Sequence, residues 1–200
     1  MSANLLAYAE KQVEDSCDTK RKLTPEFLGQ VCSLAERTAD TLGKGGCVFF
    51  CGNGGSAADA QHLAAEFVGR FQMERGALSA VSLVTNVSSL TAIANDFGYE
   101  FVFSRQIEAL AKAGDILVLI TTSGNSKNML LAAEQARKQK VFTVGLTGAS
   151  GGKLRTSVDL LLAVPSNETQ RIQEAHILLG HIYCGLVEMA IEAKKKTMTA

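Results

Sequence analysis

The sequence has no excess of charge of either sign. Its 200 residues carry 20 lysines and arginines against 20 aspartates and glutamates, so the formal net charge is zero. A protein that binds nucleic acid through its phosphates needs a basic surface, and this balance argues against such a partner. The basic run Lys194-Lys195-Lys196 falls in the last turns of a predicted helix, where cations suit the helix dipole. We interpret it as a helix end.

The sequence also lacks a long uninterrupted apolar segment. No run of about 18 apolar residues occurs, so we expect no membrane contact. The N-terminus has no signal-peptide core, because residues 8–12 already mix polar and apolar side chains. The five cysteines show no CxxC spacing, which excludes a metal ribbon or a redox motif. Most lie in apolar runs, as thiols of a reducing compartment do, and we expect a cytoplasmic protein.

The pattern of apolar residues predicts one α/β domain over residues 1–200. Helices are expected over residues 1–43, divided near Leu23-Thr24-Pro25, because Thr24 can cap a helix that has Pro25 at its first position. Strands and helices then alternate over about residues 44–195, which predicts a five-stranded parallel sheet of flavodoxin-like order. The expected strands are 46–51, 79–84, 115–120, 141–146 and 159–164, and the expected helices are 56–71, 87–111 with a break near Asp96, 126–139 and 168–195.

Two loops rich in glycine and hydroxyl side chains are the most informative feature of the chain. The first loop is CGNGGS, residues 51–56, and the second loop is TTSGNS, residues 121–126. Each follows an apolar strand and precedes a helix, so unpaired N–H groups and the positive end of the helix dipole point into it. At the carboxyl ends of strands in one sheet, the two loops can share a crevice. Hydroxyl groups add donors for phosphate or sugar oxygens, at Ser56, Thr121, Thr122, Ser123 and Ser126.

Neither loop is expected to bind a nucleotide cofactor. Residues 52–57 read G-x-G-x-x-A, but the dinucleotide fingerprint needs an acid at the end of the next strand, and the strand at 79–84 continues into Thr85-Asn86-Val87. The Gly-Lys-Ser/Thr of a phosphate-binding Walker loop is missing from both. The alternative is that both loops are ordinary tight turns without a ligand. Two similar serine-containing loops at equivalent strand ends argue against that alternative.

Titratable residues in two predicted helices are candidates for chemistry. His62 and Glu66 are four residues apart and share one helix face, where they can bind a metal or move a proton. A surface pair explains this spacing equally well. His181 lies among apolar residues, which favours a core histidine, and we expect a structural role for His176. Asn95-Asp96, at a break between helices, is either a cap or a contact to sugar hydroxyls.

Five ordered segments give the chain a specific resemblance from about residue 40 to 190. They are CGNGGS, HLAAE, NDFG, TTSGNS and RIQEAH followed by a second histidine. The chain resembles the bacterial phosphoheptose isomerases of the sugar isomerase (SIS) fold. The resemblance implies an aldose–ketose isomerase that converts sedoheptulose 7-phosphate to D-glycero-D-manno-heptose 7-phosphate for lipopolysaccharide core heptose.

Two other functions remain open at this point. Non-catalytic SIS regulators, such as the DnaA initiator-associating proteins, are similar chains, but they lack the residues that match Glu66 and His181. Another sugar-phosphate isomerase is the third possibility. The presence of both residues favours the phosphoheptose isomerase.

The resemblance also implies roles for individual residues. Glu66 would be the base that moves the proton between C1 and C2, and His181 would be its partner acid/base, which also helps to open the ring. The phosphate cradle would be Thr121, Thr122, Ser123 and Ser126, and the sugar contacts would be Asn53, Gly54, Gly55, Ser56, Asn95, Asp96 and Gln173. The chain departs from the family at Thr121, where many members have serine, and near Gln170, where some carry an acid.

Zinc and a homotetramer are further implications of the resemblance. Several members bind zinc at positions matching His62, Glu66, Gln173 and His181. Because Gln173 and His181 lie roughly 12 Å apart along a straight helix, one ion can bind both only if the side chains converge or come from different subunits. The family has active sites at subunit interfaces. Terminal helices that pack between subunits fit this, because apolar residues recur at helical spacing at Leu5, Leu6, Ala9 and Val13.

Overall fold

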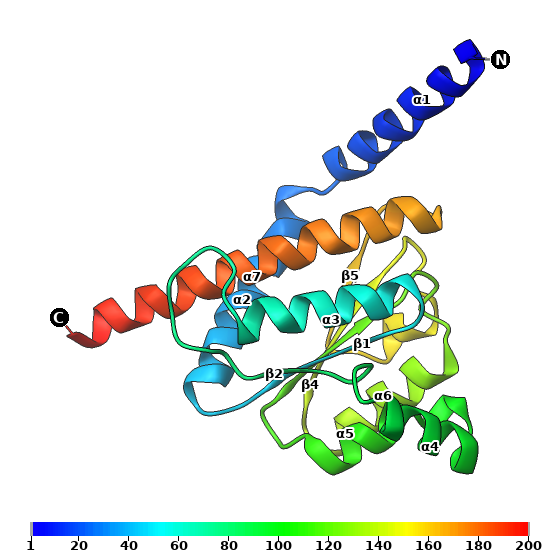
Figure 1. The fold of residues 1–200 in the computed structure, drawn as a ribbon. Coiled ribbons are helices and arrows are strands. Elements are labelled where there is room, and N and C mark those ends of the chain that lie inside the picture. The colour runs from blue at the N-terminus through cyan, green and yellow to red at the C-terminus, as the bar shows by residue number, and fades with distance from the viewer. Residues whose placement is uncertain (1, 200) are drawn as a thin grey trace.

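Five parallel strands form one sheet at the centre of the computed structural model, which describes residues 2–199 and the side chains of 4–197 (Figure 1). The strand order is β2-β1-β3-β4-β5, the flavodoxin-like order expected from the sequence. The strands are β1 (Val48–Gly52), β2 (Ala80–Ser82), β3 (Ile116–Ile120), β4 (Phe142–Thr147) and β5 (Leu160–Ala163). All neighbouring pairs are parallel, so the carboxyl ends meet at one edge.

Helices cover both faces of the sheet (Figure 1). One layer contains α2 (Pro25–Gly43), α3 (Gly55–Val68) and α7 (Thr169–Thr199), and its apolar residues pack with Phe50 and Val118. The other contains α5 (Ser104–Leu110) and α6 (Lys127–Lys138), and packs with Phe49 and Leu117. Successive strand residues point to opposite faces, which is why β1 and β3 are apolar throughout and fully buried.

Local signals in the sequence set the helix boundaries. The Thr24 hydroxyl accepts a hydrogen bond from the Phe27 N–H at 3.2 Å, which confirms the predicted cap of α2. The predicted helix at 87–111 is divided into α4 (Val87–Phe97), the 3-10 helix η1 (Tyr99–Phe101) and α5, because Gly98 adopts φ +100°. A second 3-10 helix, η2 (Gly152–Thr156), precedes β5.

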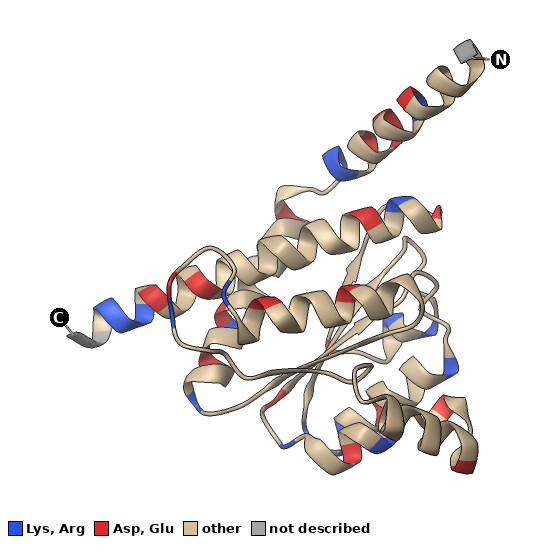
Figure 2. Ribbon diagram, viewed as in Figure 1, with Lys and Arg blue, Asp and Glu red and all other residues tan. Residues whose placement is uncertain are grey.

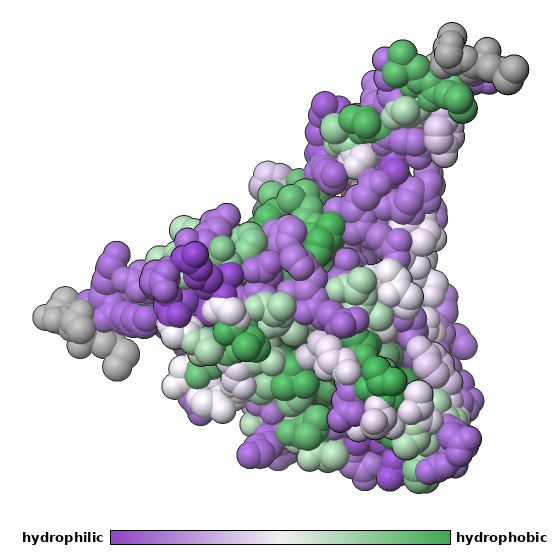
Figure 3. Space-filling view, viewed as in Figure 1, coloured by the Kyte–Doolittle hydropathy of each residue, from purple (hydrophilic) through white to green (hydrophobic). Residues whose placement is uncertain are grey.

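The helix α1 (Ser2–Arg21) extends away from the sheet and contacts mainly the start of α7 (Figure 1). The Arg171 guanidinium donates to the Gln12 carbonyl at this contact. The arm exposes the large side chains of Leu5, Leu6, Tyr8 and Val13. Figure 3 shows hydrophobic residues gathered on it. An isolated arm cannot bury this surface.

The helix α7 is long and apolar enough to cross a membrane by length and composition alone, although no run of about 18 apolar residues was found in the sequence. Its charged residues lie toward its two ends (Figure 2), and residues 175–187 between them carry none of Asp, Glu, Lys or Arg. The middle of α7 packs into the core through Ala175, Leu179 and Val187. One face of α7 is therefore part of the core.

His176 on α7 is a structural residue, as expected. Its side chain is buried, and Nε2 lies 3.2 Å from the Thr147 carbonyl oxygen. Burial lowers the pKa of the His176 imidazole to about 4, although the hydrogen bond to Thr147 acts in the opposite direction. The ring therefore stays neutral inside the fold.

Candidate active site

The first loop depends on glycine for steric reasons. Gly54 adopts φ +57°, and a Cβ on Gly52 would lie 2.2 Å from the Ser56 carbonyl oxygen. A Cβ on Gly55 would lie 2.6 Å from Nε2 of Gln173, so α7 places this amide directly against the loop. Ser56 is buried at the start of α3. The structure thus brings the predicted sugar contact Gln173 to the first loop.

The second loop follows β3, which pairs directly with β1. Because Gly52 is in register with Ile120, the two loops leave the sheet side by side, as the shared-crevice prediction requires. Thr121 is buried, and its N–H donates to Leu146 in β4. The Ser123 hydroxyl accepts a hydrogen bond from the Asn125 N–H at 3.2 Å. Gly124 adopts φ +65° where the loop passes close to Gly151. Ser126 is the N-cap residue of α6.

A pair of amides ties the two loops together. Asn53 and Asn128 exchange hydrogen bonds of 3.0 and 2.9 Å, and the Tyr99 hydroxyl donates to the Asn53 side-chain oxygen at 2.9 Å. Asn128 is buried in the first turn of α6. Sequence reasoning missed Asn128 and Tyr99. The sequence gives little sign of either role: Asn128 is a polar residue two positions after the second loop, and Tyr99 directly follows Gly98.

Asn95 and Asp96 lie in the last turns of α4 and are exposed. The Asn95 amide donates to the Asp96 carboxylate at 2.8 Å. The cap of α4 is a different residue, Asn86, whose side chain accepts from the Ser89 N–H at 3.0 Å. Asn95-Asp96 therefore lies inside α4, just before the break at Gly98, and its side chains are open to solvent.

Three titratable side chains from two helices meet and form what we call the His–Glu–His cluster: His62, Glu66 and His181. The Nε2 atoms of His62 and His181 are 2.8 Å apart, and His62 Nε2 lies 3.3 Å from Glu66 Oε1. The candidate ligand atoms all lie within 4.8 Å of one another. His181 is half-buried rather than enclosed in the core. The preference for a core histidine, drawn from its apolar sequence neighbours, is therefore wrong, because this face of α7 turns toward α3.

The donor atoms of the cluster suit a metal ion of the zinc type. Two imidazole nitrogens and one carboxylate oxygen are a common set of protein ligands in catalytic zinc sites. The two ring nitrogens at 2.8 Å are within hydrogen-bond distance, with donor and acceptor set by the ring tautomers. Gln173, the fourth residue of the implied set, packs on Gly55 at the first loop instead.

Asp59 is a further acidic group that sequence reasoning missed. It lies one turn before His62 on α3, and its Oδ2 atom is buried with no hydrogen-bond partner among the described residues. Burial raises the pKa of the Asp59 carboxyl, while the charges of His62 and His181 lower it. In the sequence, only its position three residues before His62, on the same helix face, indicates that it lies near the cluster.

The cluster and the loops are separated along α3. His62 and Glu66 follow Gly55 by 7 and 11 residues on α3, which corresponds to roughly 10 and 16 Å along the helix axis. The imidazole of His62 is 47% exposed, so the cluster is open at the surface.

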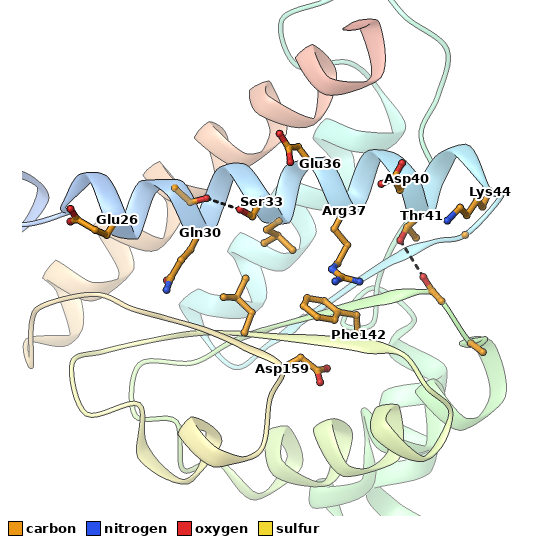
Figure 4. Close-up of a pocket in the computed structure, with 16 residues that line it drawn as sticks. Glu26, Gln30, Ser33, Glu36, Arg37, Asp40, Thr41, Lys44, Phe142 and Asp159 are labelled. Atoms are coloured by element: carbon orange, nitrogen blue, oxygen red, sulfur yellow. Dashed lines mark hydrogen bonds between the residues drawn. The ribbon is translucent and has the colours of Figure 1, made fainter. Parts of the chain in front are cut away.

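A pocket of about 810 Å³ lies elsewhere, between α2 and the amino ends of β4 and β5 (Figure 4). Arg37 stacks on the Phe142 ring at 4.1 Å, and Asp159 accepts hydrogen bonds from Thr143 at 2.7 and 2.8 Å. These groups are held by the fold at the edge opposite the glycine loops. The pocket is therefore separate from the candidate site.

Comparison with known proteins decides the family. Residues 13–148 match the SIS domain family. The phosphoheptose isomerase of Roseiflexus sp. is 51% identical over 180 residues, which cover 90% of this chain and 91% of that protein. The chain belongs to the phosphoheptose isomerase family.

Solved structures of the same family agree with this assignment. A phosphoheptose isomerase from Neisseria gonorrhoeae matches with a TM-score of 0.82 at 40% identity, over 94% of this chain and 98% of that one. One from Francisella tularensis matches with a TM-score of 0.85 at 35% identity, over 94% and 99%. As a phosphoheptose isomerase family member, the chain is an aldose–ketose isomerase of the SIS fold rather than a non-catalytic SIS regulator.

Proposed function

We propose that this protein converts sedoheptulose 7-phosphate to D-glycero-D-manno-heptose 7-phosphate, which feeds the heptose of lipopolysaccharide cores. The observation that carries the proposal is the convergence of Glu66 and His181 beside His62, in a chain that also has two adjacent loops rich in glycine and hydroxyl side chains. A regulator that only binds sugar phosphate needs the loops but has no use for the cluster.

The chemistry requires a proton to leave the carbon next to a carbonyl and return to its neighbour. The Glu66 carboxylate is the base that carries this proton between C1 and C2, and it lies within reach of both histidines of the cluster. The His181 imidazole moves the proton of the oxygen and assists ring opening. The 2.8 Å contact to His62 fixes which way that ring faces.

The phosphate end of the sugar is held by the loops. Thr121, Thr122, Ser123 and Ser126 supply hydroxyls, and the N-terminus of α6 supplies backbone N–H groups. Asn53, Gly54, Gly55, Ser56 and Gln173 surround the sugar, with Asn95 and Asp96 as further contacts. Binding energy from the phosphate, which does not react, keeps the sugar oriented at the cluster.

Zinc fits the His–Glu–His cluster as a cofactor. When bound, it supplies Lewis-acid polarisation of the substrate oxygens. His62, Glu66 and His181 would hold it within one protomer. Gln173 lies about 12 Å from His181 along α7, so we assign it as the ligand that a neighbouring subunit brings.

We infer that the enzyme is a cytoplasmic homotetramer with active sites shared between subunits. Two observations support this. The α1 arm exposes apolar residues that an interface would cover. The separation of the cluster from the glycine loops along α3 is also large for one small sugar phosphate to bridge within a single protomer.

One assay tests the activity. Purified protein is incubated with sedoheptulose 7-phosphate, with added zinc and after chelation, and the aldose product is followed by NMR. We expect turnover, and faster turnover with zinc than after chelation. Absence of turnover under every metal condition would indicate a sugar-phosphate binder, and faster turnover of a different ketose phosphate would indicate another isomerase.

A further inference from the structure

A buried ion pair, Glu188 with Arg75, lies at the carboxyl end of α3, the helix that carries Glu66. Glu188 follows His181 by two turns on α7, and its side chain is 1% exposed. Its carboxylate accepts hydrogen bonds from the N–H groups of Phe71, Gln72 and Met73 at 2.9 to 3.0 Å. Arg75 Nε donates to the same carboxylate at 2.9 Å. Glu188 thus fixes the backbone of the segment that follows α3.

Arg75 holds the end of α3 itself. Its guanidinium donates to the carbonyl oxygens of Glu66 at 2.8 Å, Phe67 at 2.9 Å and Gly69 at 3.2 Å. These carbonyls belong to the last turn, where a helix leaves its acceptors without internal partners. One of these carbonyls belongs to Glu66. The Arg75 guanidinium therefore fixes the position of the backbone that carries the proposed base.

Phe71 connects the ion pair to the proposed acid. Its N–H is bound to Glu188, and its ring stacks against the His181 imidazole with centroids 5.5 Å apart and an interplanar angle of 14°. His62 contacts His181 from another direction, with ring centroids 5.1 Å apart. The imidazole of His181 is therefore held between His62 and Phe71.

The electrostatics keep this unit charged. Burial raises the pKa of the Glu188 carboxyl, but the N–H groups of Phe71, Gln72 and Met73 and the charge of Arg75 outweigh it, and the pKa lies below its usual value. A buried ion pair is a weak source of stability, since well-packed apolar residues often do as well. The ion pair matters here because it sets geometry. Four donors bind the Glu188 carboxylate, and they can do so in only one arrangement of residues 71–75.

We propose that Glu188 and Arg75 are positioning residues for the isomerisation, setting the relative geometry of Glu66 and His181 through the end of α3 and the ring of Phe71. The inference rests on the proposed function, because it takes Glu66 and His181 as the acid/base pair. Neither Glu188 nor Arg75 is placed in contact with the substrate.

The first test removes only the ring contact. Phe71→Leu keeps the N–H bond to Glu188 but loses the face that packs on His181. We expect kcat to fall about 10-fold, because residues that orient reacting groups typically contribute 10- to 100-fold, with KM for the sugar phosphate nearly unchanged. Phe71→Tyr restores a ring and should recover kcat.

The second test disrupts the carboxylate. Glu188→Gln presents NH₂ to backbone N–H donors, so the segment must shift, and we expect kcat to fall about 10- to 100-fold with KM nearly unchanged. Glu192→Gln is the matched control. It is the same change one turn along α7, on a 37% exposed carboxylate, and should leave kcat unaltered.

An independent readout separates this proposal from the proposed function. The ring current of Phe71 shifts the NMR resonances of the His181 imidazole, and we expect these to move in Phe71→Leu and in Glu188→Gln but not in Glu192→Gln. If the wild type fails to isomerise the sugar but these resonances move, the activity assignment falls and the positioning role stands. Variants that stay folded by circular dichroism with wild-type kcat and unmoved His181 resonances would overturn the proposal.

Discussion

Replacing Glu66 by glutamine tests the central step most directly. The amide matches the carboxylate in shape but cannot accept the proton from C1 or C2. Loss of a positioned acid/base costs about 10²- to 10⁴-fold in rate, equivalent to about 2.7 to 5.5 kcal/mol in activation free energy. We therefore expect Glu66→Gln to abolish nearly all turnover.

The same substitution should leave the fold almost unchanged. The Glu66 side chain is 21% exposed, and its ion-pair contact is to His62 at 3.3 Å, with the imidazole 47% exposed. A pair open to solvent contributes about 0 to 1 kcal/mol to stability. The backbone carbonyl that Arg75 holds is untouched by the change. The thermal midpoint should therefore stay close to that of the wild type.

The assay follows aldose formation from sedoheptulose 7-phosphate, and calorimetry measures binding of the same sugar phosphate. We expect binding within a few-fold of the wild type with kcat reduced at least 100-fold. His62→Gln changes the side chain that contacts Glu66 but keeps the Glu66 carboxylate. Comparing the two variants separates loss of the base from disturbance of the cluster around it. Retention of more than about a tenth of the wild-type kcat would remove Glu66 from the role of base.

Three further predictions concern the phosphate loop, the buried histidine and assembly. Ser123→Ala should raise KM, since a hydrogen bond to a charged group contributes about 1.5 to 3 kcal/mol; an unchanged KM for the phosphorylated sugar would mean that the second loop is not the cradle. His176 has a folded-state pKa of about 4, below the unfolded 6.5, so the unfolded chain takes up the proton first and stability should decrease as pH falls from 6.5 to 4, by about 3 kcal/mol. His176→Gln should flatten this part of a denaturation series, and an equally steep series would contradict the assignment. Deleting residues 1–22 should reduce assembly and activity together, and a fully active monomer in light scattering would refute the shared site.

The architecture was predictable because its signals are local. Apolar runs of strand length, each followed by a helical pattern, indicated a parallel sheet, and all five strands were found with boundaries shifted by at most two residues. Thr24 and Pro25 marked the start of α2 because a cap involves only neighbouring residues. The glycines of the first loop were also recognisable, since their steric requirement arises within the loop and its helix.

The meeting of α3 and α7 was not predictable from pattern alone. His62 and His181 are 119 residues apart, and the spacing of His62 and Glu66 left a surface pair equally acceptable. A histidine among apolar neighbours suggested a core residue, whereas α7 places His181 half-buried against His62 of α3 and buries His176. Only the resemblance to phosphoheptose isomerases identified His181 beforehand.

The sequence by itself determined the strand and helix order, the two loops and the family, because these depend on side-chain periodicity, steric limits of the backbone and ordered motifs. The tertiary structure alone decided which polar groups meet: Asn53 with Asn128, His62 with His181, and Glu188 with Arg75. Such contacts join elements distant along the chain, and they form only when burial of apolar faces has fixed the helices against the sheet.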